Sequence, residues 1–250
     1  MRMFLRIVLL GLILSLFISS TFVSAKEVIG FPIGLKFAAE NREKAVTPIA
    51  SRYHMISISG SGKYAIIHYV PDDDYNYYHT DYVSEILRNK EYSVIIWNAG
   101  NNKCRNSECT NYFLRALNRD IRVIYYYGHT AKNDKKEIWG LIMDDIYGIT
   151  TDIYAGNFKA VGANLNGALI FVLGCDSYKL RQGFKKYYSV TYVGTKGQIA
   201  LIYIKSKGKK FWDELSKGKT AKQAVDAIQP HWWEFRCPEF GLDGDSSWKL

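Results

Sequence analysis

Two short apolar runs, each closed by a glycine and a reactive side chain, constrain the fold of this chain more than any other feature. The first run covers 123–127 and leads through glycine to His129, and the second covers 168–173 and leads through glycine to Cys175. Both runs have the composition and length of buried strands. In parallel α/β sheets, functional groups collect just beyond the carboxyl ends of strands. We therefore expect neighbouring strands that bring His129 and Cys175 into one crevice.

A thiol beside an imidazole can attack a carbonyl carbon as a nucleophile. Taken singly, His129 is typical of a hydrogen-bonded turn residue, and Cys175 is typical of inert packing or of a disulfide with Cys237. If Cys175 is a reactive nucleophile, its thiol is expected to be free and to have a depressed pKa. Both residues follow strands of the same kind, so the sequence favours a shared site. The remaining histidines have no comparable setting: His54, His68, His79 and His231.

Strand-like and helix-like segments alternate along the chain, which predicts a doubly wound α/β fold with right-handed crossovers. The expected strands cover 63–70, 92–97, 123–127, 168–173 and 189–193. One expected helix starts at Thr80, and four others cover 110–117, 151–163, 211–215 and 220–228. A small hairpin is expected within 137–143. Apolar residues make up 48% of the chain, which is ample for one core.

The formal net charge is +9, to which Arg2 and Arg6 contribute two. The remaining excess of lysine and arginine is spread along the chain, which is usual for solubility. Because the sequence has no arginine-rich or aromatic-interleaved cluster, nucleic acid is not an expected partner.

The N-terminus has the pattern of a signal peptide. Arg2 and Arg6 form a basic region, 7–18 is apolar, and 19–25 is small and polar. We expect cleavage before Lys26, an extracytoplasmic or secreted protein, and no stable membrane insertion afterwards. The alternative is an uncleaved anchor, since 4–23 could cross a bilayer.

Four cysteines in an exported chain favour disulfides. Cys104 and Cys109 lie in one polar loop and predict a local disulfide more than a metal site, because no second pair has matching spacing. The carboxylates of 72–74 suit either a calcium ion or a solvated loop end, and the latter is more usual. No cofactor or metal is expected in the reactive site. We expect a signal peptide over 1–25, an N-terminal extension over 26–62, an α/β domain over 63–229 and an aromatic tail over 230–250, which serves as a lid or packing segment.

The motifs ending in His129 and in Cys175-Asp176-Ser177 resemble those of the caspase–legumain–gingipain superfamily of cysteine peptidases, including its CHAT branch. The resemblance extends upstream to 72–87 and downstream to 192–197 and 211–220, so it covers most of 63–228. A histidine that precedes the cysteine is unlike the papain order and agrees with the caspase type, where it lies roughly 50 residues upstream.

The resemblance implies a caspase-like three-layer sandwich with a mostly parallel central sheet. It also implies that Cys175 is the nucleophile of an endopeptidase and that His129 protonates the leaving amine. The family's oxyanion hole uses backbone N–H groups that correspond here to Cys175 and Thr130, although the family usually has glycine at the second position. Asp176 matches loosely an acidic residue that recognises basic side chains, or it caps a turn.

The resulting expectation is an exported cysteine endopeptidase that acts on polypeptides through a thioester acyl-enzyme, with a preference for basic residues as a further implication. The alternative is a caspase-like domain without catalysis that serves as a binding or envelope-assembly module. A small-molecule hydrolase or transferase using the same thiol is a third alternative.

Overall fold

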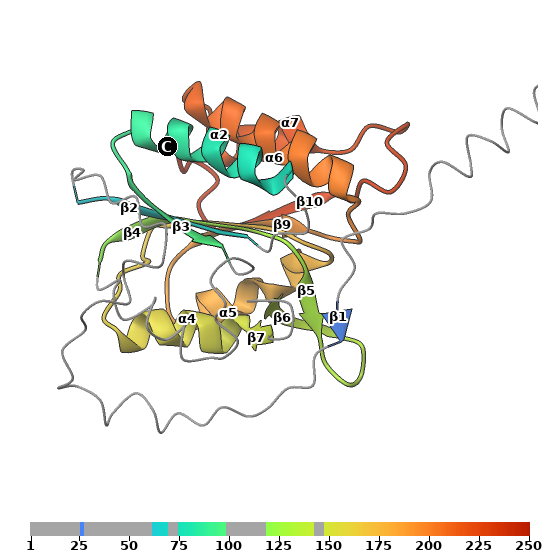
Figure 1. The fold of residues 1–250 in the computed structure, drawn as a ribbon, viewed down its shortest axis with the longest axis horizontal. Coiled ribbons are helices and arrows are strands. Elements are labelled where there is room, and N and C mark those ends of the chain that lie inside the picture. Colours follow the sequence, from blue (N-terminus) through green and yellow to red (C-terminus); the bar gives the residue numbers. More distant parts are fainter. Residues whose placement is uncertain (1–25, 28–61, 70–74, 99–118, 143–147) are drawn as a thin grey trace, which may run out of the picture.

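The computed structural model describes residues 26–27, 62–69, 75–98, 119–142 and 148–250. These residues form an α/β fold in which helices cover both faces of a six-stranded, mostly parallel mixed sheet (Figure 1). This confirms the fold class expected from the alternating segments. The expectations for 1–25, His54, 72–74, Cys104, Cys109 and the helix over 110–117 lie outside the described residues.

The central sheet has the strand order β10-β9-β8-β4-β2-β3. All neighbouring pairs are parallel except β10 with β9, which is antiparallel. The central strands β4 and β8 are apolar almost throughout because helices cover both of their faces. The strand bounds are β2 Tyr64–Tyr69, β3 Ser93–Asn98, β4 Ile121–Tyr127, β8 Leu169–Leu173, β9 Thr191–Thr195 and β10 Phe240–Asp243.

A second, small sheet follows His129 directly. It has the order β1-β5-β6-β7, with β1 Lys26–Glu27, β5 Thr130–Lys132, β6 Ile138–Ile142 and β7 Gly148–Thr150. The hairpin expected within 137–143 is therefore one strand, β6, which pairs with β5 before it and β7 after it. The turn into β6 is closed by Asn133, whose side-chain oxygen accepts from the backbone amides of Lys135 and Glu137.

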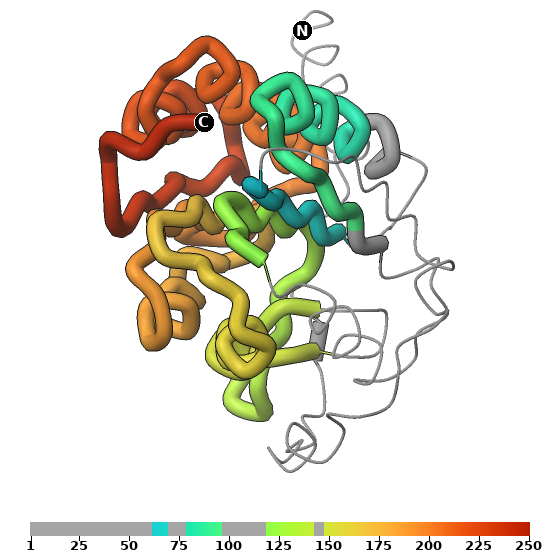
Figure 2. Tube along the Cα trace, turned by 90° about the vertical axis from the view of Figure 1, so that its left-hand side faces the viewer, coloured from blue at the N-terminus to red at the C-terminus, as the bar shows by residue number. Residues whose placement is uncertain are grey.

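One face of the sheet carries α2 (Tyr75–Asn89), α6 (Leu201–Ser216) and α7 (Ala221–Ile228). The other face carries α4 (Thr151–Ala160), the 3-10 turn η3 (Ser177–Leu180) and α5 (Arg181–Lys185), so the arrangement has three layers (Figures 1 and 2). Thr150 caps α4, since its hydroxyl accepts from the amide of Ile153. Among the described helices, none has the length and apolar character needed to cross a membrane.

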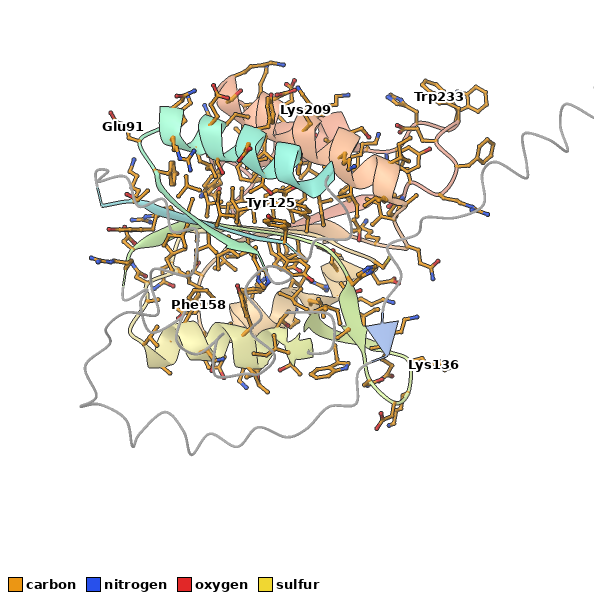
Figure 3. The ribbon with its side chains drawn as sticks, viewed as in Figure 1. Glu91, Tyr125, Lys136, Phe158, Lys209 and Trp233 are labelled. Atoms are coloured by element: carbon orange, nitrogen blue, oxygen red, sulfur yellow. The ribbon has the colours of Figure 1, made fainter. Side chains whose placement is uncertain are left out.

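Side chains that alternate along β4 divide the core in two. Val123, Tyr125 and Tyr127 face the layer of α6, whereas Ile124 and Tyr126 face the layer of α4. Figure 3 shows Tyr125 between the sheet and the helices above it. The starts of two helices differ from expectation: α2 begins at Tyr75 and not at Thr80, and α6 begins ten residues before the expected 211.

The C-terminal segment is tied to the domain. β10 extends the central sheet at its β9 edge, and Trp248 lies in the core cluster on the α6 side. The Trp248 indole donates to the carbonyl of Gly167 at 2.9 Å, and its own carbonyl accepts from the amide of Ala221 at 2.7 Å. The aromatic tail therefore contributes a strand and a core residue to the α/β domain.

Helix α6 packs closely on a buried polar pair. The Nε2 atom of His79 and the hydroxyl of Tyr125 are hydrogen-bonded at 2.6 Å. A Cβ atom added at Gly208 would lie 2.8 Å from that hydroxyl and 3.0 Å from both Nε2 of His79 and a methyl of Leu173. The absence of a side chain at this position allows the helix to lie against the pair.

Gly208→Ala is therefore expected to destabilise the protein by about 1–3 kcal/mol, as overpacking of a filled core does. Gly156→Ala is the matched control, because a Cβ added at this helical glycine in α4 would lie 3.4 Å from the hydroxyl of Tyr187, which is an ordinary van der Waals contact. It is expected to stabilise by about 0.5–1 kcal/mol through backbone entropy. Urea unfolding of both variants checks the signs, and equal effects would contradict the packing argument.

Burial lowers the pKa of His79 to about 4, with a further contribution from the nearby Lys205. The neutral imidazole is favoured in the folded state, so stability is present above the ordinary pKa of about 6.5 and is lost as the pH falls towards 4. The expected loss is about 3 kcal/mol. Urea titrations at several pH values should show a smaller loss in His79→Gln than in the parent, whereas the exposed His231→Gln should retain the parent's loss.

Candidate active site at the carboxyl ends of β4 and β8

Strands β4 and β8 are parallel neighbours in the sheet, as the sequence predicts. Their last paired residues are Tyr127 and Leu173, and His129 and Cys175 each stand two positions beyond this pair. The structure therefore places both candidate residues at one edge of the sheet and at the same level.

The turns after the two strands are hydrogen-bonded to each other. The amide of Gly128 donates to the carbonyl of Leu173 at 3.0 Å, and the hydroxyl of Thr130 donates to the carbonyl of Cys175 at 2.7 Å. A Cβ atom added at Gly174 would lie 2.8 Å from the carbonyl oxygen of Gly128. Glycine is therefore required at 174 for the turns to approach this closely.

The peptide group between His129 and Thr130 has a fixed orientation. The carbonyl of His129 accepts hydrogen bonds from the hydroxyl of Tyr126 at 2.5 Å and from the amide of Ile142 at 3.1 Å. In a trans peptide the N–H points opposite to the C=O. The N–H of Thr130 therefore points away from β6. The side chain of His129 is buried, with 6% of the residue exposed.

Cys175 is a free thiol, and so is Cys237, so the structure does not contain the alternative disulfide between them. Only 1% of Cys175 is exposed, and its Sγ atom contacts the carbonyl of Ile199 at 4.0 Å. Burial raises the pKa of the Cys175 thiol, and the nearby Asp176 adds to this, while the Ile199 contact and Lys132 act in the opposite direction. The expectation of a depressed pKa is therefore wrong in direction, because the thiol lies in apolar packing.

Two hydroxyl side chains that the sequence analysis did not single out hold the turn after Cys175. The hydroxyl of Thr195, at the end of β9, donates to the carbonyl of Gly174. The hydroxyl of Ser177 donates to the carbonyl of Val172 at 2.7 Å and accepts from the amide of Thr195 at 3.0 Å. The sequence indicated that Gly194 and Thr195 end a strand. It did not indicate that this strand, β9, pairs with β8 and so brings Thr195 to the turn after Cys175.

Asp176 adopts a left-handed backbone conformation, with φ of 55°. Its amide donates to the carbonyl of Gly197 at 2.8 Å, and its carboxylate forms an ion pair with Lys179 at 3.0 Å. The carboxylate makes no capping hydrogen bond to η3, so the turn-capping alternative does not occur.

Other candidate groups lie elsewhere in the fold. His68 is buried in β2 and packs edge-on against Tyr126, His79 belongs to α2, and His231 lies in the loop between α7 and β10. Within the described ranges, no three His, Cys, Asp or Glu side chains cluster so as to hold a metal ion.

The arrangement is that of an α/β protein whose mostly parallel sheet carries a histidine and a free cysteine past two neighbouring strands. No protein-family model matches the chain, and no curated protein is significantly similar to it.

The raised pKa of Cys175 has a direct chemical consequence. Because only the thiolate is alkylated, we expect iodoacetamide to modify folded Cys175 with a pH midpoint above the ~8.5 of a free thiol. Burial raises the pKa of Cys237 to about 11, so its midpoint should also lie above that of a free thiol. Timed alkylation and peptide mass spectrometry, compared with the urea-unfolded chain, measure both midpoints. A folded midpoint at or below the unfolded value would contradict the assignment.

Proposed function

We propose that this chain is an exported cysteine endopeptidase that uses Cys175 as nucleophile and His129 as acid–base partner. The observation that carries the proposal is the pairing of β4 with β8, which sets the two residues at the same level of one sheet edge. The hydrogen bond from Thr130 to the Cys175 carbonyl supports it, because it fixes the two turns against each other. The motif resemblance to caspase-like peptidases agrees with this arrangement.

The raised pKa of Cys175 favours a resting neutral thiol over a preformed thiolate. In the proposed reaction, His129 takes the thiol proton as sulfur attacks the substrate carbonyl carbon. It then gives the proton to the leaving amine as the carbon–nitrogen bond breaks, and water hydrolyses the thioester. Lys132, in β5, favours the thiolate by its charge and helps this proton transfer.

The backbone N–H groups of Thr130 and Cys175 are the proposed oxyanion donors. The fixed peptide between His129 and Thr130 supports this role for Thr130, because its N–H points away from β6. Losing one such donor typically costs ~100- to 1000-fold in turnover. The position needs the backbone alone, so the threonine side chain is compatible with it and uses its hydroxyl for the Cys175 carbonyl.

Asp176 is the proposed recognition group for a basic substrate side chain. Its carboxylate already pairs with Lys179, whose side chain is 62% exposed. An exposed pair of this kind contributes ~1 kcal/mol or less, so a lysine or arginine of a polypeptide substrate can displace Lys179 at small cost. The signal-like N-terminus is the basis for proposing that the protein acts outside the cytoplasm.

One observation favours the alternative of a non-catalytic binding or envelope-assembly module. Cys175 is nearly inaccessible and packs among apolar residues in this structure. Buried thiols of this kind are usually inert. The two functions predict different outcomes with a substrate-like electrophile, because only the peptidase is expected to be modified at Cys175.

The peptidase proposal predicts that a peptide bearing an acyloxymethyl ketone after arginine modifies Cys175, and that the modification is lost in His129→Ala. Fluorogenic arginine peptides should be cleaved, with no turnover in Cys175→Ala and ~100- to 10,000-fold less in His129→Ala, the range for general acid–base catalysis. Cys237→Ala is the matched control and should keep both activities.

A peptide panel differing only in arginine, lysine or glutamine before the scissile bond tests the role of Asp176 in the same assay. Neither labelling nor turnover with any member would support the non-catalytic module. Labelling without peptide cleavage would support a thiol-dependent hydrolase or transferase of small molecules.

A further inference from the structure

The small sheet that follows His129 has β1 as its outer strand among the described residues. β1 pairs in parallel with β5, so that Lys26 lies opposite Ala131 and Glu27 lies opposite Lys132. On its other side β5 pairs with β6 in the antiparallel direction. Figure 1 shows β1 at the end of this sheet, beside β5. A segment that is distant in the sequence therefore lies along the strand that leaves the candidate site.

β5 begins inside the candidate site. Its first residue is Thr130, whose hydroxyl donates to the carbonyl of Cys175 at 2.7 Å. Thr130 and Ala131 are buried, with 0% of each residue exposed. Backbone groups at a buried strand need hydrogen-bond partners, because a buried donor or acceptor without one is costly. The edge of β5 is therefore a place where an extended segment is stabilised by its backbone.

The pairing that covers this edge is short, which makes it exchangeable. β1 and β5 share two residue pairs, whereas β4 and β8 share five. Main-chain pairing depends little on side-chain identity, so another extended segment can form the same hydrogen bonds. A strand that also reaches Thr130 would pair with all of β5, and so with one residue more than β1 does.

We propose that the edge of β5 is a strand-addition site for an extended polypeptide, and that Lys26–Glu27 occupies it as an intramolecular competitor. In strand addition, main-chain hydrogen bonds to the edge of a sheet supply the affinity. The occupant is an extended polypeptide because β1 is itself such a segment, bound at this edge. Displacement of β1 opens the edge, so this segment regulates access to it.

The direction of β1 assigns this edge to one side of the scissile bond, a step that rests on the proposed peptidase function. β1 runs parallel to β5, so a chain bound in the same direction passes Thr130 first and Lys132 last. Thr130 adjoins His129 and is hydrogen-bonded to Cys175, where the proposed reaction cleaves the peptide bond. The substrate residues along β5 are therefore those after the scissile bond, and they leave with the amine that His129 protonates.

The test uses the full chain with Cys175→Ala, which cannot turn over, and a fluorescent synthetic peptide that has the sequence of residues 24–31. The double variant Lys26→Pro with Glu27→Pro removes both backbone donors of β1, so whichever N–H bonds to β5 is lost. By fluorescence anisotropy it should bind the peptide about tenfold more tightly than the parent, as expected if β1 leaves the edge open about a tenth of the time. The matched control Lys26→Ala with Glu27→Ala keeps both donors and should bind the peptide as weakly as the parent.

Hydrogen exchange locates the bound peptide, and intact mass establishes that all the proteins begin at the same residue. The amides of 130–132 should exchange faster in the proline variant than in the alanine variant, and saturating peptide should restore their protection. Proline is tolerated in edge strands, and thermal unfolding checks that the variant folds. If it does not fold, the parent gives the same test, because excess peptide should slow exchange of these amides further. Equal peptide affinity in the two variants would overturn the proposal, as would unchanged exchange of these amides on adding peptide.

Turnover by the chain that retains Cys175 separates this proposal from the proposed function. For arginine peptides that continue for several residues past the scissile bond, the proline variant should lower KM by about tenfold and leave kcat unchanged. Arginine peptides that end in a fluorogenic amide lack those residues, so their KM should stay the same. A lower KM for both kinds of substrate would contradict the side assigned to β5. Absence of turnover would overturn the proposed peptidase, whereas strand addition is decided by anisotropy and hydrogen exchange with the inactive chain.

Discussion

The parallel pairing of β4 with β8 is the interaction on which the candidate site depends. Tyr127 opposite Leu173 sets the level at which both strands end, and every later contact between the two turns follows from it. The hydrogen bond from Thr130 to the Cys175 carbonyl forms only at this register, and so does the close approach at Gly174. Because side chains alternate along a strand, a slip of one residue would turn the following side chains to opposite faces of the sheet.

The same packing that positions Cys175 also suppresses its ionisation. The thiol belongs to the apolar cluster on the α6 side, and its Sγ atom contacts the Ile199 carbonyl. A buried thiol gains an ordered position and loses solvation of its charged form, which raises its pKa. If Cys175 acts as the proposed nucleophile, it is deprotonated when the substrate and the imidazole approach the sulfur. The buried thiol is protected from alkylation and oxidation before that step.

The sequence predicted the parts of this fold that local patterns determine. The apolar runs at 123–127 and 168–173 identified β4 and β8, and the helix expected over 151–163 corresponds to α4. It did not predict β10, because Phe240–Asp243 becomes a strand only through its pairing with β9. The depressed pKa expected for Cys175 failed for a related reason. Burial raises this pKa, and the apolar cluster that buries the thiol is assembled from segments that are distant in the sequence, which no local pattern indicates.

The end of β9 and the turn after it link two regions that are distant in the sequence. Their residues Thr195, Gly197 and Ile199 contact, in order, the carbonyl of Gly174, the amide of Asp176 and the sulfur of Cys175. The same turn contacts the loop between α7 and β10, since a Cβ at Gly197 would lie 3.2 Å from Pro238 and the amide of Lys196 donates to the carbonyl of Glu239. The loop between α7 and β10 therefore packs against the segment that covers the thiol on the Ile199 side.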